Sequence, residues 1–259
     1  MSMTQVEFDL YAKQGYNRIP VAREILADLD TPLSTYLKLA DTGYSYLFES
    51  VHGGEKWGRY SIIGLPCETI IRVTGQQIVT SHRGKVIDQA ISDDPLSWIE
   101  NYKNQYKVPI ISNLPRFNGG LVGYFGYDTV RYIEPRLGDS PNPDPLECPD
   151  ILLMVSNDLI VFDNLSGRLF LIVHADPEKP NAYDPAQQNL DDLTSRLRTA
   201  TPNKQVTSAR QLMKKILFPG LLMMGLLRLS KKQNNTLQMA ISCKSFFHSD
   251  FLCPFQLKQ

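Results

Sequence analysis

Three polar residues near position 50 have the types and the spacing to bind a small zwitterion. Glu49 and Ser50 follow an aromatic stretch, and Lys56 comes shortly afterwards, beyond a Gly-Gly pair. A carboxylate accepts hydrogen bonds from an ammonium group, whereas a hydroxyl and a lysine donate to a carboxylate. The trio therefore suits a ligand that carries both charges. From the residues alone, the alternative is a solvated hairpin end with one surface ion pair, as in many polar loops.

The segments around this trio predict a β-hairpin. Between positions 44 and 49 the aromatic residues alternate with a period near two, which is typical of a strand. The segment 52–56, His-Gly-Gly-Glu-Lys, predicts a turn because glycine adopts positive φ without steric cost. An aromatic and β-branched run over 57–63 predicts the returning strand. Such a hairpin would bring the three polar side chains to one tip.

Strands outnumber helices in the rest of the pattern. A short helix is expected within the first 20 residues, and no state is favoured for 21–28. Thr31 is a good N-cap and Pro32 suits a first helical turn. Further helices are expected at 95–106, 128–134 and 186–198, and further strands at 69–73, 77–82, 85–87, 151–155, 159–162 and 168–174. This pattern predicts an α+β fold, with antiparallel, sandwich-like sheets and helices packed outside.

Glycines interrupt an aromatic, β-prone run at 119–128, GGLVGYFGYD. A glycine inside a strand usually marks the close approach of another backbone or ring. The run is not GxGxxG before a helix, so a dinucleotide site is disfavoured. We interpret it as a tightly packed, buried strand.

Composition excludes several classes of function. Lysine and arginine number 27 and aspartate and glutamate also 27, so nucleic acid and anionic membrane are not expected partners. The four cysteines are scattered without CxxC spacing, which argues against zinc and for a reducing compartment. The N-terminus lacks the pattern of a signal peptide, and no apolar run is long enough to span a bilayer. A cytoplasmic protein is expected.

No catalytic constellation stands out in the sequence. There is no Ser-His-Asp spacing, no P-loop, no HExxH and no obvious pair of carboxylates. His52, His82 and His174 are isolated, and an isolated histidine is more often structural than catalytic. The residues by themselves indicate an α+β domain with a small-molecule site at the first hairpin.

Residues 4 to 200 resemble the N-terminal half of anthranilate synthase component I, the large subunit of the chorismate-using enzyme that opens tryptophan biosynthesis. Four motifs carry the resemblance, in order: GYNRIPVAREILADLDTPLSTYLKLA, YLFESVHGGEKWGRYSIIGLP, GGLVGYFGYDTVRYIE and NDLIVFDN. YLFES stands where the family usually has LLES, with Phe48 in place of the second leucine. GRYSIIG favours this subunit over aminodeoxychorismate synthase component I, whose segment tends to run SRFDI. A fragment of that relative is the alternative.

The resemblance implies roles for the opening trio. In the family the LLES element forms part of the feedback site for L-tryptophan, so Glu49 and Ser50 are expected to bind tryptophan. Lys56, in the following loop, matches the family's site less closely and is a weaker assignment. The resemblance also implies an intact enzyme that makes anthranilate and pyruvate from chorismate. That enzyme uses Mg²⁺, and its ammonia comes from a glutamine amidotransferase subunit (component II). The chorismate- and magnesium-binding residues lie in the family's C-terminal half. No catalytic residue, metal ligand or cofactor is therefore expected in this chain, which should be inactive alone.

The composition changes abruptly near position 205. From 205 to 259 one acidic residue stands against eight basic ones, so the tail carries +7 and the rest of the chain −7. All twelve tyrosines precede the tail, whereas four of the seven methionines lie within it. The tail also departs from the family's pattern, which continues there with an acidic linker.

A frameshift accounts for this tail. Methionine has the single codon ATG, so reading out of phase across Met223, Met224 and Gly225 forces Asp-Gly, and Met239 before Ala240 forces Gly. The segments around these points permit the family's continuation. We therefore predict a frameshift between about positions 202 and 214, with a tryptophan-sensing domain at 1–200 and a non-native, disordered or poorly packed tail at 201–259. The alternative to the frameshift is a genuine basic amphipathic tail for membrane or partner binding. The alternative for function is a non-functional frameshift product.

Overall fold

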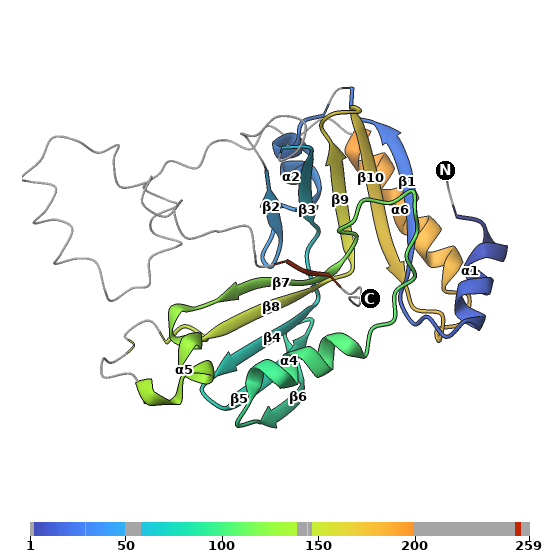
Figure 1. The fold of residues 1–259 in the computed structure, drawn as a ribbon. Coiled ribbons are helices and arrows are strands. Elements are labelled where there is room, and N and C mark those ends of the chain that lie inside the picture. The colour runs from blue at the N-terminus through green and yellow to red at the C-terminus, as the bar shows by residue number, and fades with distance from the viewer. Residues whose placement is uncertain are drawn as a thin grey trace, which may run out of the picture. The chain divides into compact units, whose positions relative to one another are not determined.

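Two antiparallel sheets with helices packed against them make up the fold (Figure 1). The computed structural model describes residues 3–28, 30–49, 58–138, 144 and 147–198, and the backbone of 252–254. The first sheet has the strand order β1 (Ile19–Leu26), β10 (Arg168–Ala175), β9 (Asp158–Asp163), β3 (Tyr60–Gly64) and β2 (Tyr46–Phe48). The second has the order β11 (Leu252–Pro254), β7 (Gly120–Phe125), β8 (Ile151–Ser156), β4 (Thr69–Thr74), β5 (Gln77–His82) and β6 (Lys85–Ile91). The predicted α+β fold is confirmed.

The helices of the described residues are α1 (Gln5–Lys13), α2 (Pro32–Leu39), α4 (Pro95–Asn104), α5 (Val130–Ile133) and α6 (Tyr183–Arg198), with 3₁₀ turns η1 (Tyr127–Thr129) and η2 (Pro135–Leu137). Their starts follow from capping residues. Thr4 and Thr31 each accept a hydrogen bond from the backbone N–H three residues on, and Asp94 does the same for α4. The predicted N-cap at Thr31 is confirmed.

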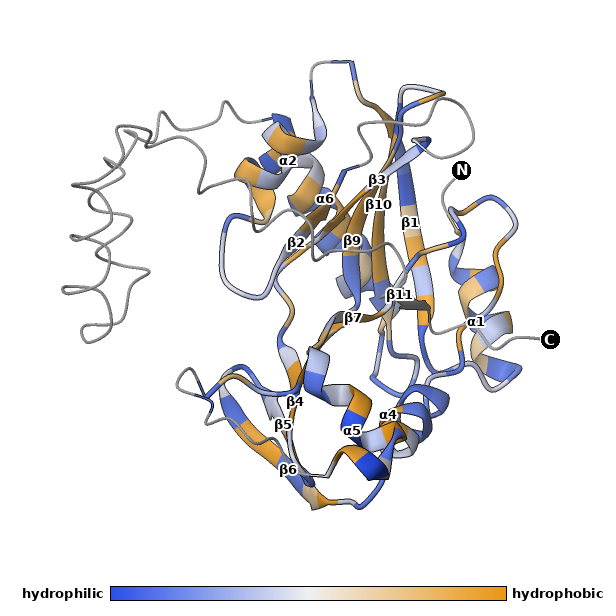
Figure 2. Ribbon diagram, turned by 60° about the vertical axis from the view of Figure 1, so that its left-hand side comes forward, coloured by the Kyte–Doolittle hydropathy of each residue, from blue (hydrophilic) through white to orange (hydrophobic). Residues whose placement is uncertain are grey.

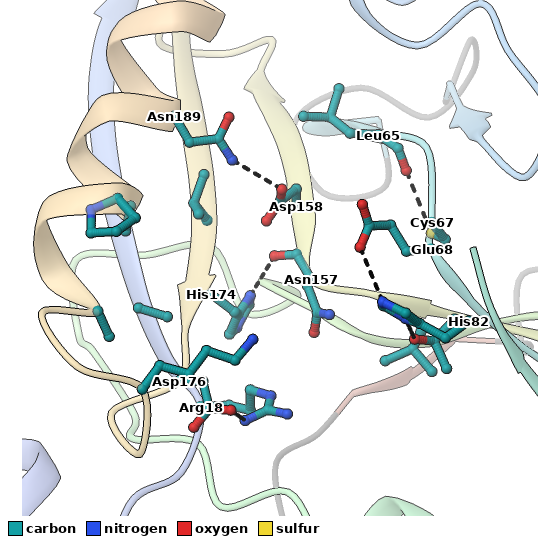
Figure 3. A pocket seen from close by; sticks show the side chains of 18 of the residues that line it. Arg18, Leu65, Cys67, Glu68, His82, Asn157, Asp158, His174, Asp176 and Asn189 are labelled. Carbon is teal, nitrogen blue, oxygen red and sulfur yellow. Dashed lines mark hydrogen bonds and ion pairs between the residues drawn. The ribbon is translucent and has the colours of Figure 1, made fainter. Parts of the chain in front are cut away.

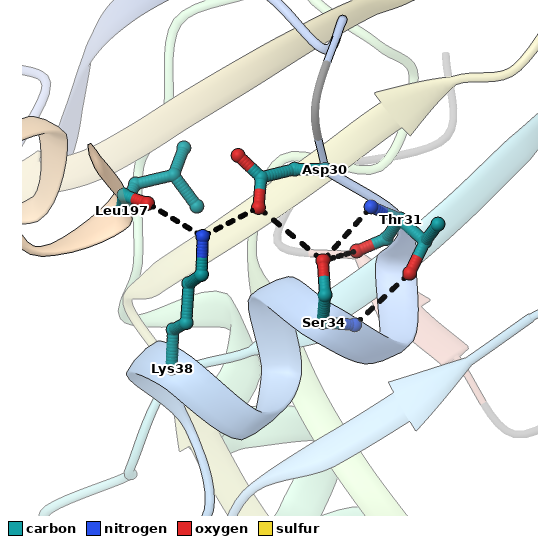
Figure 4. Close-up of polar contacts among 5 residues, drawn as sticks. All are labelled: Asp30, Thr31, Ser34, Lys38 and Leu197. Atoms are coloured by element: carbon teal, nitrogen blue, oxygen red, sulfur yellow. Dashed lines mark hydrogen bonds and ion pairs between the residues drawn. The ribbon is translucent and has the colours of Figure 1, made fainter. Parts of the chain in front are cut away.

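A lysine joins the helices α2 and α6 (Figure 4). Lys38 in α2 donates from Nζ to the carboxylate of Asp30 and to the carbonyl oxygen of Leu197, each at 2.8 Å. Leu197 lies in the last turn of α6, where carbonyl groups have no partner within the helix. Ser34 Oγ donates to the same Asp30 carboxylate, so the start of α2 and the end of α6 share one network.

The helix α6 covers one face of the first sheet with the apolar stripe that its sequence predicts. Ala186, Leu190, Leu193 and Leu197 are all buried. They pack with apolar side chains of β1, β3, β9 and β10 in one cluster, and Figure 2 shows many hydrophobic residues, in orange, along the ribbons of β3 and β10. Burying a leucine side chain contributes about 2 kcal/mol. This face is therefore the main source of stability for the first sheet.

The segment without a predicted state, 21–28, forms most of the strand β1. Its first four residues, from Ile19 to Ala22, are buried on both faces. Val21 belongs to the cluster under α6, whereas Ala22 packs in a separate cluster with Leu159 and Ile172. Where a strand is buried on both faces it loses the alternation of polar and apolar residues, and only the second half of β1, from Arg23 to Leu26, is partly exposed.

The glycines at 119–126 lie where another backbone or ring comes close. A Cβ at Gly123 would lie 1.8 Å from the carbonyl oxygen of Leu152 in the neighbouring strand β8. A Cβ at Gly119 would lie 2.5 Å from the imidazole ring of His174. The strand interpretation is confirmed by β7, of which Leu121 and Val122 are almost fully buried.

Two short connections carry the chain from one sheet to the other. Residues 65–68 lead from β3 to β4, and Asn157 alone separates β8 from β9. Next to these connections the hydroxyl groups of Tyr46 and Ser156 share a buried hydrogen bond of 2.7 Å. Because both connections run through the same region, polar backbone and side chains gather there at the junction of the sheets.

Candidate functional site

The structure describes one residue of the sequence-predicted trio. Glu49 directly follows Phe48, the last residue of β2, and its side chain is exposed. Ser50 and Lys56 lie outside the described residues, as does the predicted turn at 52–56. The expected convergence of the three side chains therefore remains a prediction, with Glu49 at the strand end where that prediction needs it.

The buried carboxylate of Asp163 binds Arg59, which follows the predicted hairpin tip in the sequence. Asp163, at the end of β9, accepts hydrogen bonds from Arg59 Nε at 3.1 Å and Arg59 Nη2 at 2.7 Å. The Arg59 guanidinium holds the pKa of that carboxyl below its usual range. Asn164 donates from Nδ2 to the carbonyl oxygen of Gly58 and to Ser61 Oγ, both at 3.1 Å. The motif NDLIVFDN thus fixes the start of β3 and, with it, the returning arm of the predicted hairpin.

A second candidate site is a pocket of about 560 Å³ at the junction of the two sheets (Figure 3). Its walls come from both connections between the sheets, from the end of β10 and from the first half of α6. The polar residues that line it are Arg18, Glu68, Thr69, His82, Arg83, Asn157, Asp158, His174, Asp176, Lys179 and Asn189. Glu49 does not line it. The volume lies within the usual range for small-molecule sites.

The carboxylate of Asp158 lies inside this pocket. Its Oδ2 accepts a hydrogen bond of 3.1 Å from Asn189 Nδ2 of α6. Burial raises the pKa of Asp158 from 3.8 to about 6, and the nearby Glu68 carboxylate adds to the rise. At pH 7 the group is ionised, but its ionised form is less stable here than in water.

His174 of β10 is held in one tautomer beside the pocket. Its Nδ1 lies 2.6 Å from the carbonyl oxygen of Asn157, which can only accept, so Nδ1 carries the proton. Burial lowers the pKa of His174 to about 4. The imidazole is therefore neutral at pH 7. A structural role, as predicted for an isolated histidine, fits this ring. Its hydrogen bond holds Asn157, the residue at which the chain passes from one sheet to the other.

Ion pairs surround the rim of the pocket. Arg18 lies 3.1 Å from Asp176, and Arg83 lies 2.8 Å from Glu68. His82 Nε2 is 3.6 Å from the same Glu68 carboxylate. These pairs place most of the charged groups of the rim against an opposite charge within the protein itself.

The sequence analysis did not identify this pocket. A signal for it exists in the motif NDLIVFDN, where the polar residues Asn157 and Asp158 interrupt two apolar strands. Two adjacent polar residues between buried strands must find polar partners or water. That requirement indicates a polar junction at this point, although it does not say which distant residues supply the partners.

The described residues give no metal centre. Among them, no three His, Cys, Asp or Glu side chains are grouped so that they hold a metal ion. The described residues thus do not fit the Mg²⁺ ion that the resemblance implies for an intact enzyme. Within the same part of the chain, no helix has the length and apolar character to cross a membrane.

Comparisons with known proteins give a consistent family. No family model matches the chain. The chain is 58% identical over 196 residues to anthranilate synthase component 1 of Pseudomonas aeruginosa and 50% identical over 199 residues to that of Neisseria meningitidis. Each match covers 76% of this chain and 40% of the relative, so the chain spans less than half the length of these relatives.

A solved structure gives the same name. The structure of anthranilate synthase component I from Streptococcus pneumoniae is 26% identical to this chain, with a TM-score of 0.45 over 69% of this chain and 37% of that one. The family identification rests on the sequence identities of 50% to 58% with the curated relatives. Over 76% of its length, the chain is therefore similar to anthranilate synthase component 1.

Proposed function

We propose that the chain is a truncated anthranilate synthase component I, which retains part of an L-tryptophan feedback site and lacks the catalytic part. The observation that carries this proposal is the tail from position 205, whose out-of-phase codons permit the family's continuation after a stretch that is 58% identical to a component 1. Glu49 would accept hydrogen bonds from the ammonium group of tryptophan. Ser50 and Lys56 would donate to its carboxylate. Asp163 would position the returning strand through its pair with Arg59.

The tail supports the truncation. From position 205 the tail has one acidic residue and no tyrosine. The residues that its methionine codons fix in another reading frame permit the family's continuation. Both observations favour a frameshift in the gene of a full-length subunit. A non-functional product is the second candidate, because a severed domain exposes surface that the rest of the subunit would cover. The nucleotide sequence decides between a frameshift and a genuine basic tail, since only the first requires the family's continuation in another frame.

The partners of an intact subunit are inferred from the full-length relatives, and they form part of the proposal. Because these relatives are named component 1, the intact subunit would work with a second component, which we propose is a glutamine amidotransferase that supplies ammonia. The intact enzyme would use Mg²⁺ to convert chorismate to anthranilate and pyruvate in the cytoplasm. In that enzyme, tryptophan bound at the hairpin would inhibit the reaction.

The purified chain is expected to form no anthranilate from chorismate, ammonium and Mg²⁺. The reason is that the catalytic residues implied by the family lie outside the part that the chain matches. Anthranilate fluorescence measures the reaction directly, and the full-length Pseudomonas aeruginosa relative is the positive control. Fluorescence that rises with the concentration of this chain would contradict the truncation, whatever the chain binds.

Tryptophan is expected to bind the chain weakly, with a Kd of about 1 mM, because only part of its site is present. Glu49→Gln and Ser50→Ala should each weaken binding at least tenfold, whereas the exposed Ser112→Ala serves as an unchanged control. Isothermal titration calorimetry measures the affinity. An absence of heat at 10 mM tryptophan, or equal binding by all variants, would remove the hairpin from the proposal.

A further inference from the structure

The charged side chains of the pocket at the sheet junction sum to zero. Three acidic residues line it, Glu68, Asp158 and Asp176, and so do three permanently basic ones, Arg18, Arg83 and Lys179. Such a balance disfavours a ligand with a large net charge of either sign. What the pocket attracts depends on which of these groups are already paired.

Four of the six charges are paired with one another. Arg18 pairs with Asp176 at 3.1 Å, and Arg83 pairs with Glu68 at 2.8 Å. The two remaining groups are the carboxylate of Asp158 and the ammonium of Lys179. Neither makes an ion pair within 4 Å among the residues that the structure describes. One acid and one base, both lining the same cavity, are thus available to a ligand.

The carboxylate of Asp158 is held in a fixed position, and its ionised form is destabilised by burial. Both properties are typical of a group that binds a ligand. The hydrogen bond to Asn189 holds the carboxylate in place, and the side chain is only partly accessible. A desolvated carboxylate without a cation is unfavourable unless a charged partner arrives. Burial is the main cause of the raised pKa of Asp158, and the Glu68 carboxylate adds to it. A ligand ammonium would supply the charged partner.

Lys179 has the opposite character. It is exposed in the loop between β10 and α6, where its backbone N–H donates to the carbonyl oxygen of Asp176. The loop fixes its Cα, while its four-carbon side chain leaves the ammonium free to turn toward a bound anion. A ligand whose ammonium is on Asp158 would thus meet a cation at the pocket wall.

Part of the remaining lining is apolar, beside the polar residues Thr69, His82, Asn157, His174 and Asn189. Leu65, Val155, Val173, Ala175, Ala182 and Ala186 contribute to the walls. A cavity of about 560 Å³ with aliphatic stretches in its walls and two unpaired charges has room for a small aliphatic body between two charged ends.

We propose that this pocket binds a small aliphatic zwitterion, with its ammonium on Asp158 and its carboxylate on Lys179. Glu49 of the hairpin does not line this pocket, and the proposal does not depend on the proposed tryptophan binding. The ligand class follows from the two unpaired charges, the aliphatic part of the lining and the volume of the pocket.

Three matched compounds test the proposal on the purified 259-residue chain at pH 8. L-leucine carries both charges, 3-methylbutylamine only the ammonium and 4-methylpentanoate only the carboxylate. Calorimetry should give L-leucine a Kd below about 1 mM, and each analogue should bind at least tenfold more weakly. No binding of L-leucine at 10 mM, or equal binding of the three compounds, would overturn the proposal.

Two variants locate the bound ligand. Asp158→Asn and Lys179→Gln should each weaken L-leucine binding at least tenfold, and Lys179 is exposed, so its replacement leaves the fold intact. Glu178→Gln and Lys107→Gln are the matched controls, since both residues are exposed and neither lines the pocket. Glu49→Gln should also leave L-leucine binding unchanged. If Glu49→Gln abolishes it while the pocket variants do not, the ligand binds at the hairpin and the pocket assignment is wrong.

Discussion

Gly123→Ala is expected to lower the free energy of unfolding by about 3 kcal/mol. A Cβ at this position would lie 1.8 Å from the carbonyl oxygen of Leu152 and 2.9 Å from the Cα of Leu153. These atoms belong to the backbone of β8, which pairs with β7 in register at Gly123 and Leu153. No side-chain rotation relieves the contact. The strands must move apart, which weakens the ladder between β7 and β8 in the second sheet.

Gly43→Ala is the matched control for this change. No heavy atom lies within 4 Å of a Cβ built at Gly43, and its backbone is not in the left-handed region. Its replacement should alter stability by less than about 0.5 kcal/mol. Urea denaturation followed by tryptophan fluorescence measures both variants. A loss of less than about 1 kcal/mol for Gly123→Ala would show that the strands separate more easily than their packing indicates.

Asp158→Asn is expected to stabilise the protein at pH 8 by about 2 kcal/mol. The pKa of Asp158 is about 6 in the folded state, against 3.8 for the free group. The folded state therefore binds this proton more tightly than the unfolded chain does, and stability falls as the pH rises from about 4 to 6. Above pH 6 the full cost of the ionised carboxylate is present. Asparagine removes the charge and keeps an acceptor for Asn189.

The stabilisation should disappear near pH 3.5, where the carboxyl is protonated in both states. Chemical denaturation of the two proteins at a series of pH values gives the difference directly. Glu178→Gln removes an exposed carboxylate from the neighbouring loop and should show no comparable gain at pH 8. If Asp158→Asn were destabilising by more than about 1 kcal/mol at pH 8, the carboxylate would have a favourable partner in the folded state, contrary to the geometry of the pocket.

His174 has the opposite dependence on pH over nearly the same range. Its folded pKa is about 4, against 6.5 for the free imidazole, so the unfolded chain binds this proton first as the pH falls. Stability from this residue is thus lost between about pH 6.5 and 4. In the native protein the two contributions oppose each other. Asp158→Asn removes one of them, so the variant should lose stability in acid more steeply than the native protein does.

The sequence predicted the elements whose patterns are local. The stripe of α6, from Ala186 to Leu197, the cap at Thr31 and the close contact at Gly123 each follow from residues within one segment. The strand β1 was not predicted, because its first half is buried on both faces and its partner β10 lies about 150 positions away, with Ile19 opposite Ala175. Periodicity reports which face is buried and not which distant strand lies beside it.

The candidate sites differ in the same way. The hairpin trio lies within eight consecutive residues, so its chemistry was readable from residue types and from the family resemblance, although two of its members lie outside the described residues. The pocket joins Arg18, Asp158 and Lys179, which are far apart in sequence. Each of them alone is an ordinary charged residue. Only the folded arrangement shows that Arg18 is already neutralised by Asp176 while Asp158 and Lys179 have no ion-pair partner among the described residues.

The single residue between β8 and β9 has a consequence for how the domain comes apart. Because only Asn157 connects these two strands, one sheet can hardly unfold while the other keeps its structure. The backbone of Asn157 is itself bound by His174, and the neighbouring Ser156 by Tyr46 of the other sheet. Unfolding of either sheet therefore disrupts the hydrogen bonds and the short connection that it shares with the other sheet. The two sheets therefore form one cooperative unit of unfolding, despite their separate strand orders.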